Sequence, residues 1–154
     1  MRFTSEIDLR DHFWMMYSRS NKNIIAYQFE AKARTGATDL VTIEKVKNKD
    51  RSGFHIEICS FEFKLDDLQK VFAQAYANSA FSHKSFVVVP ANKRRAIEDN
   101  YTDYYKKYPS IGCIAVDHPE DNGGRYKMFH YAHARLDCEL QLNQEILKLC
   151  CKVL

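Results

Sequence analysis

The sequence predicts an α/β protein in which a central mixed β-sheet is flanked by helices. A helical pattern opens the chain, three strand-like segments follow it without an intervening helix, and a second helical pattern leads to a short continuous apolar run. Strands that follow one another directly favour antiparallel pairing, whereas a strand reached through a crossover helix pairs in parallel. The sheet should therefore contain both kinds of pairing.

The first helix is expected over Ser5–Ser20. Ser5 can cap it, with the acid Asp8 three residues later, and Leu9 and Phe13 recur on one face at helical spacing. An apolar face of this kind packs against a sheet or another helix.

Three segments rich in strand-forming residues come next, and a polar, charged loop at Lys47–Gly53 separates the last two as a hairpin would. The expected strands are Ile24–Ala31, Asp39–Val46 and Phe54–Leu65. In the third, the apolar positions change parity, so either a bulge interrupts the strand or both of its faces are covered.

Asp66 or Asp67 can start a second helix that runs to about Ser79. It leads to the apolar run Phe86–Val89, which is stopped by Pro90 and is typical of a buried parallel strand. After it we expect a charged helix, two strands and an amphipathic C-terminal helix whose apolar positions are Leu140, Leu147, Cys150 and Leu154. Their expected ranges are Ala91–Tyr108, Ile111–Val116, Tyr126–Arg135 and from about Asp137 onward.

A chain of 154 residues with 45% hydrophobic content supports one domain with a substantial core. We therefore expect a single domain over 1–154, with a core at about 4–90 and a C-terminal extension over 91–154. No apolar run approaches the roughly 18 residues that span a bilayer, and Met1–Arg10 lacks the apolar stretch of a signal peptide. We expect no membrane partner and a cytoplasmic location.

The formal net charge is +3, from 23 basic and 20 acidic residues, which is far below that of a passive nucleic-acid binder. Any contact with nucleic acid must be local. The basic run Lys93–Arg95 could flank such a contact or form an ordinary solvated surface. The five cysteines show no CxxC spacing, so they are interpreted as reduced thiols that lie mostly in the core.

Asp39, Glu62 and Lys64 form the group of residues most informative about chemistry. Glu62 and Lys64 are two apart in a strand and project from the same face. One of two adjacent hairpin registers places Asp39 opposite Glu62, whereas the other places it opposite Phe61. Two adjacent carboxylates repel each other, but with Mg²⁺ or Mn²⁺ between them they become metal ligands, and a neighbouring lysine can position water. That chemistry requires the first register.

This arrangement resembles the PD-(D/E)XK nuclease superfamily. Asp39 in GATDLV stands where the family has its first Asp, although Thr38 replaces the usual Pro, and Glu62-Phe63-Lys64 matches the (D/E)-x-K motif on the next strand. The resemblance covers about Thr4 to Val89, and more loosely reaches Arg135. It implies a restriction-endonuclease-like fold, metal binding by Asp39, Glu62 and the Phe63 carbonyl, and catalysis by Asp39, Glu62 and Lys64.

Two further positions follow from the same resemblance. Glu6, in the pattern E-x-x-L-x-x-x-F, is similar to the first-helix acid that many members add to the metal site, but it also suits a first-turn acid favoured by the helix dipole. Gln74 resembles the glutamine of exonuclease-type members and would be a substrate contact. Those members place Tyr four residues later, where this chain has Asn78.

The sequence therefore predicts a metal-dependent nuclease that hydrolyses phosphodiester bonds with a metal-activated water. DNA is favoured over RNA as the substrate, and a homodimer or larger complex would supply additional binding surface. Two alternatives stay open. The first is a catalytically silent protein of the same fold that binds nucleic acid or assists assembly, and the second is an unrelated α/β interaction protein.

Overall fold

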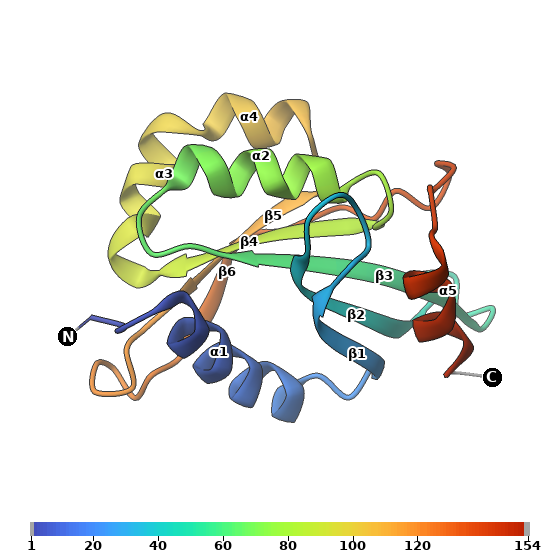
Figure 1. The fold of residues 1–154 in the computed structure, drawn as a ribbon, viewed down its shortest axis with the longest axis horizontal. Helices are drawn as coiled ribbons and strands as arrows, with labels where there is room; N and C mark the ends of the chain where they lie inside the picture. The colour runs from blue at the N-terminus through green and yellow to red at the C-terminus, as the bar shows by residue number, and fades with distance from the viewer. Residues whose placement is uncertain (1, 153–154) are drawn as a thin grey trace.

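The chain forms one six-stranded mixed sheet with the strand order β1-β2-β3-β4-β5-β6 (Figure 1). This computed structural model describes residues 2–152. The strands are β1 (Ile24–Ala31), β2 (Thr38–Lys47), β3 (Phe54–Phe63), β4 (Lys84–Pro90), β5 (Ile111–Val116) and β6 (Tyr126–His130). β1 to β3 form an antiparallel meander, β3 to β5 pair in parallel, and β6 is antiparallel to β5.

Helices cover both faces of the sheet, with α1 on one face and α2, α3 and α4 on the other (Figure 1). Among the described residues the helices are α1 (Glu6–Ser20), α2 (Leu68–Asn78), α3 (Arg94–Asn100), α4 (Thr102–Lys107) and α5 (Gln144–Cys151), and a 3₁₀ turn (Ala91–Lys93) precedes α3. The predicted α/β architecture with a mixed, helix-flanked sheet is therefore confirmed.

α1 begins as the sequence predicts, because the Ser5 side chain accepts a hydrogen bond from the backbone N–H of Asp8. Its buried residues Leu9 and Phe13 pack onto Phe61 and Phe63 of β3. Side chains alternate along a strand, so Glu62 between these two phenylalanines points to the opposite face, toward α2.

The parity change in the third strand has a simple explanation. The β2–β3 register is continuous from Leu40↔Phe61 to Lys47↔Phe54, so no bulge is present. Ile58 instead faces the cluster under α5, whereas Phe61 and Phe63 face α1. Both faces of β3 are covered, at different points along its length.

α2 is the crossover that turns the chain from β3 into the parallel strand β4. Asp67 caps it, accepting a hydrogen bond from the N–H of Lys70. Val71 and Phe72 of α2 pack on Val87 of β4. The predicted helix, crossover and buried parallel strand are thus confirmed, although β3 ends at Phe63, two residues earlier than expected.

The prediction of one continuous helix over Ala91–Tyr108 is wrong. The chain leaves helical geometry at Tyr101, which has φ −120°, and separates α3 from α4. The Tyr101 ring stacks on Phe72 of α2 with centroids 4.4 Å apart, and Tyr104 packs edge-on against the same ring. The break brings both aromatic rings onto α2, and this tertiary contact outweighs local helix propensity.

Two C-terminal boundaries also differ from the sequence prediction. β6 ends at His130 rather than Arg135, because its pairing with β5 stops at Cys113↔His130. α5 starts at Gln144 rather than near Asp137, with Asn143 as its cap. Its buried residues are Ile146 and Leu149, whereas the expected core position Leu147 is 47% exposed. Leu154 lies outside the described residues.

The cysteine prediction is only partly correct. Cys59 and Cys113 are buried, but Cys138 and Cys151 are exposed and Cys150 is half-buried, so most are not core residues. All five are free thiols. Within residues 2–152, no helix is long and apolar enough to cross a membrane.

Candidate functional site

The carboxyl end of β3 brings Asp39 and Glu62 together. The register between β2 and β3 is the predicted one, and its next step beyond Leu40↔Phe61 sets Asp39 opposite Glu62. At this point Asp39 bonds to β3 with its side chain, because its Oδ2 accepts a hydrogen bond of 2.9 Å from the Phe63 N–H. This bond fixes the Asp39 carboxylate beside the end of β3.

The Glu62 carboxyl group is completely buried, with 0% exposure. Its Oε1 accepts hydrogen bonds from Arg34 Nη2 at 3.1 Å and from Asn78 Nδ2 at 3.0 Å. Its Oε2 is buried and accepts no hydrogen bond from any residue in the described part of the chain. A buried acceptor without a donor costs free energy inside a protein. A proton or a bound cation at Oε2 would remove that cost.

The environment of Glu62 favours its protonated form. Burial is the largest cause, the charge of Asp39 is the next, and together they raise the pKa of Glu62 to about 7. The hydrogen bond from Asn78 and the charge of Arg34 lower the pKa, whereas the hydrogen bond that protonated Glu62 donates to Asp39 raises it further. The two carboxyl groups therefore share a site in which one negative charge is tolerated better than two.

A buried amide supports this pair from α2. The Asn78 side chain is completely buried, and its Oδ1 accepts hydrogen bonds from Arg34 Nε at 2.6 Å and from Thr38 Oγ1 at 3.0 Å. Asn78 thereby orients Arg34 while it donates to Glu62. The last turn of α2, the start of β2 and the segment before β2 all meet at this one side chain.

Lys64 lies just past the end of β3, where its backbone N–H donates to the Val88 carbonyl at 3.2 Å. Its ammonium group donates to both carboxylate oxygens of Glu6, at 3.1 and 3.3 Å. The lysine side chain is only 15% exposed, whereas that of Glu6 is 44% exposed. The structure thus pairs Glu6 with Lys64 and not directly with Glu62.

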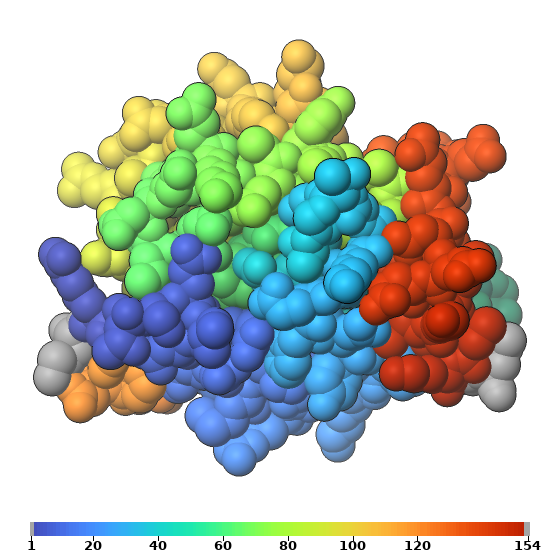
Figure 2. All heavy atoms as spheres, in the orientation of Figure 1, coloured from blue at the N-terminus to red at the C-terminus, as the bar shows by residue number. Residues whose placement is uncertain are grey.

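A small cavity of about 100 Å³ opens beside this ion pair. Its lining consists of Glu6, Ile7 and Arg10 of α1, Glu30 of β1, Asp39 of β2 and Phe63 of β3. Figure 2 shows that α1, the segment after β1 and the chain around α2 are neighbours on one surface of the molecule. Glu6, Asp39 and Phe63 therefore border the same space.

Glu30 is strained at this cavity. Its φ of +49° lies in the left-handed region that a glutamate rarely adopts, and its ladder position is opposite Asp39, between the pairs Phe29↔Leu40 and Ala31↔Thr38. The Glu30 carboxylate lies 3.6 Å from Arg10 on α1. Glu30 is thus the third acid on the lining of the small cavity, after Glu6 and Asp39.

The donor set fits a partly hydrated divalent cation better than a fully protein-coordinated one. Within residues 2–152, no group of three or more His, Cys, Asp and Glu side chains is arranged to hold a metal ion. Mg²⁺ usually binds through one or two carboxylates and keeps several waters, and Mn²⁺ accepts the same oxygen ligands. Asp39 and the unpartnered Oε2 of Glu62 meet that requirement.

Gln74 lies one helical turn before Asn78 on the same face of α2. Its Oε1 is buried and accepts no hydrogen bond from a described residue. It does not line the small cavity beside Asp39. The expected role as a substrate contact stays a prediction.

Sequence reasoning missed Arg34, Asn78, Arg10 and Glu30. Asn78 carried a usable signal, since it occupies the position four residues after Gln74 that attracts attention in the sequence. Arg34 carried none, because it reaches Glu62 from an irregular segment between β1 and β2.

Comparisons with protein-family models, with curated proteins and with solved structures find no match to this chain.

Proposed function

We propose that this protein is a metal-dependent nuclease of the PD-(D/E)XK type with a restriction-endonuclease-like fold, and that it hydrolyses phosphodiester bonds, preferentially in DNA. The observation that supports this function best is the pair of Asp39 and Glu62 carboxyl groups at the end of β3. Glu62 carries a buried oxygen without a donor, and Lys64 follows two residues later. The order of α1, meander, α2 and parallel β4 also suits that fold.

In this proposal Asp39 and Glu62 hold Mg²⁺ or Mn²⁺, and the Phe63 carbonyl supplies a further ligand. The bound cation would acidify a coordinated water and offset negative charge on the phosphate. Glu62 must lose its proton when it binds the cation, so the Arg34 and Asn78 hydrogen bonds help by stabilising its charged form.

Lys64 has the role of orienting the attacking water and stabilising charge as the phosphate oxygen becomes more negative. In the structure the Lys64 ammonium donates to the carboxylate of Glu6, which lines the small cavity. Glu6 therefore acts as a positioning residue for Lys64, and it would complete the metal site where the lysine turns to the substrate.

The test is a cleavage assay on a labelled panel of single-stranded, duplex and branched DNA and RNA, with Mg²⁺, Mn²⁺ or EDTA. The wild-type protein should cleave at least one substrate with metal and none with EDTA. Asp39→Asn keeps the shape of the side chain but removes its charge, and it should be inactive in every arm. If the wild-type protein cleaves nothing with either metal, the catalytically silent binding or assembly module becomes the better explanation.

A further inference from the structure

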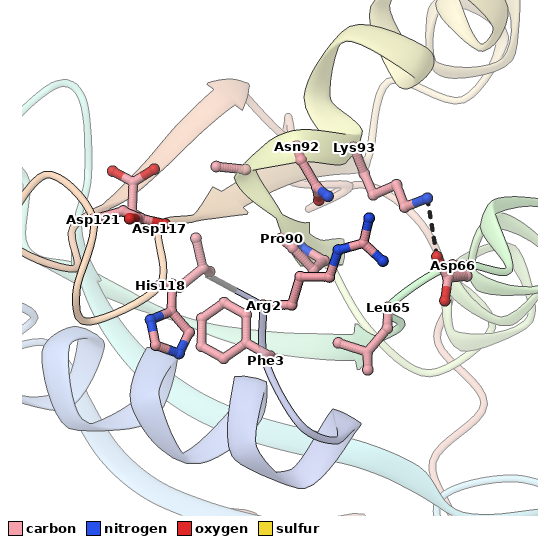
Figure 3. Close-up of a pocket in the computed structure, with 12 residues that line it drawn as sticks. Arg2, Phe3, Leu65, Asp66, Pro90, Asn92, Lys93, Asp117, His118 and Asp121 are labelled. Carbon is pink, nitrogen blue, oxygen red and sulfur yellow. Dashed lines mark ion pairs between the residues drawn. The ribbon is translucent and has the colours of Figure 1, made fainter.

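A second and larger pocket lies at the carboxyl ends of the parallel strands (Figure 3). Its volume is about 310 Å³. Leu65 and Asp66 follow β3. Pro90 ends β4, and Ala91 to Lys93 form the next turn. Val116 ends β5, and Asp117 and His118 follow it. Open α/β sheets commonly bind ligands at this edge, and the volume suits a small ligand.

One side of the pocket is positively charged. Figure 3 shows the Arg2 guanidinium pointing into the space beside Lys93 and Asp66. Lys93 pairs with Asp66 at 3.0 Å, whereas Arg2 makes no ion pair or hydrogen bond with a residue that the structure describes. The Asp66 side chain is 86% exposed, so solvent weakens its effect. This side of the pocket thus holds two positive charges and one exposed carboxylate, and the excess positive charge attracts an anion.

The opposite side of the pocket carries the Asp117 carboxylate, which is a hydrogen-bond acceptor. His118 and Asp121 line the same side, and Figure 3 shows all three residues across the pocket from Arg2 and Lys93. The Nδ1 atom of His118 already accepts a hydrogen bond from the Glu120 N–H. A ligand that fits both sides carries an anionic group at one end and hydrogen-bond donors at the other. A nucleotide unit has this polarity, since its phosphate is anionic and its sugar hydroxyls and base amino groups donate.

The pocket is a direct neighbour of the candidate catalytic centre. Asp66 follows Lys64 by two residues, and Arg2 precedes Glu6 by four, so the two segments that carry the Glu6–Lys64 ion pair continue directly into the lining of this pocket. A nucleic-acid strand with its reacting phosphate at Asp39 and Glu62 can extend past Lys64 into this space.

We propose that this pocket binds the nucleotide next to the cleaved phosphodiester, with Arg2 and Lys93 contacting its phosphate. The proposal deepens the proposed nuclease function and rests on it. It assigns substrate binding to two residues outside the motif-bearing strands, and it makes the pocket a site for a nucleic-acid strand.

The test measures binding without catalysis, by fluorescence anisotropy of a labelled oligonucleotide in EDTA. Arg2→Gln and Lys93→Gln should each weaken binding about fivefold or more. Each should also reduce the slope of log K against log salt by about 0.7–0.9, because each removes one phosphate contact. Arg95→Gln is the matched control, since Arg95 is two residues from Lys93, is 93% exposed and does not line the pocket.

Asp66→Asn should change the oligonucleotide affinity in the opposite direction. It removes the carboxylate that competes for Lys93 and should tighten oligonucleotide binding, while the α2 cap at Asp67 stays intact. Equal affinity of wild type, Arg2→Gln and Lys93→Gln, or no binding by wild type, would overturn the pocket assignment. If the wild-type protein cleaves DNA while both variants keep its affinity and KM, the nuclease function stands and this subsite fails. Variant-sensitive binding without cleavage would support the subsite and reject the nuclease function.

Discussion

Glu62 determines how the site responds to pH. The two Oε1 hydrogen bonds stabilise its charged form, yet burial and the charge of Asp39 prevail and raise its pKa to about 7. A native state with a raised carboxyl pKa binds a proton more tightly than the unfolded chain does. Glu62 should therefore destabilise the metal-free protein as pH rises from its ordinary pKa near 4.5 to about 7.

Glu62→Gln removes this charge but keeps an oxygen for Arg34 and Asn78. In EDTA the variant should be more stable than wild type above pH 7, by on the order of 2–3 kcal/mol, and this difference should vanish near pH 4.5. Chemical denaturation of both proteins between pH 4 and 8.5 measures it. A stability difference that does not depend on pH would contradict the assignment.

Glu57 provides a control, because its pKa shift and its effect on stability have the opposite sign to those of Glu62. It is also buried, but its hydrogen bonds from Lys84 at 2.8 Å and His55 at 2.6 Å outweigh burial and lower its pKa. Its charge stabilises the protein above its ordinary pKa, and this contribution is lost as pH falls. Glu57→Gln should therefore be less stable than wild type at pH 7, with a difference that shrinks in acid.

At the scale of elements, the last turn of α2 connects the parts of the site through the hydrogen bonds of Asn78. Asn78→Ala would leave Arg34 Nε and Thr38 Oγ1 without their acceptor, and it would remove one of the two donors to Glu62. We expect a loss of about 2 kcal/mol or more in the free energy of unfolding, because buried polar groups lose their partners. Chemical denaturation measures this loss, and Lys70→Ala, on the exposed face of the same helix, should change stability little.

If Asn78 had only a structural role, Asn78→Ala would lower stability without changing the pH dependence of cleavage. Since its hydrogen bond lowers the pKa of Glu62, Asn78→Ala should also move the pH profile of metal-dependent cleavage to higher pH. An unchanged profile would contradict the positioning role.

The elements that could be predicted are those whose signals are local. Ser5–Ser20, Ile24–Ala31 and Phe86–Val89 combine caps, β-branched runs and stop signals, and the structure follows them. The break at Tyr101 could not be predicted, because it depends on the ring of Phe72 in a different helix. The late start of α5 reflects a cap at Asn143 that periodicity alone does not locate.

In the candidate site, too, residues placed by regular strands could be predicted better than residues placed by tertiary packing. The sequence left two hairpin registers open, and the structure adopts the one that places Asp39 opposite Glu62, as the expected chemistry requires. Arg34 and Arg2 come from irregular segments, and their positions depend on the packed tertiary structure. The partnership of Glu6 with Lys64 across 58 residues likewise needed coordinates.

At the scale of the whole molecule, the candidate site and the larger pocket lie at the same edge of the sheet. Asp39, Glu62 and Lys64 gather where β2 begins and β3 ends, and the larger pocket lies at the ends of β4 and β5. A formal net charge of +3 gives little general attraction for nucleic acid. Under the proposed function, substrate binding must therefore come from local groups such as Arg2 and Lys93, and it should be sensitive to salt.

The central claim is that Asp39 and Glu62 hold a divalent cation on which Lys64-dependent cleavage relies. Two quantities should be measured on the same proteins: Mn²⁺ affinity, by electron paramagnetic resonance, and turnover of the best panel substrate. The proteins are wild type, Lys64→Ala and Asp39→Ala, with Lys148→Ala on α5 as the control. Lys64→Ala should bind Mn²⁺ at least as tightly as wild type, because a nearby positive charge is removed, while turnover falls about 10²-fold or more. Asp39→Ala should lose both. Full turnover in Lys64→Ala, or wild-type Mn²⁺ affinity in Asp39→Ala, would contradict the account.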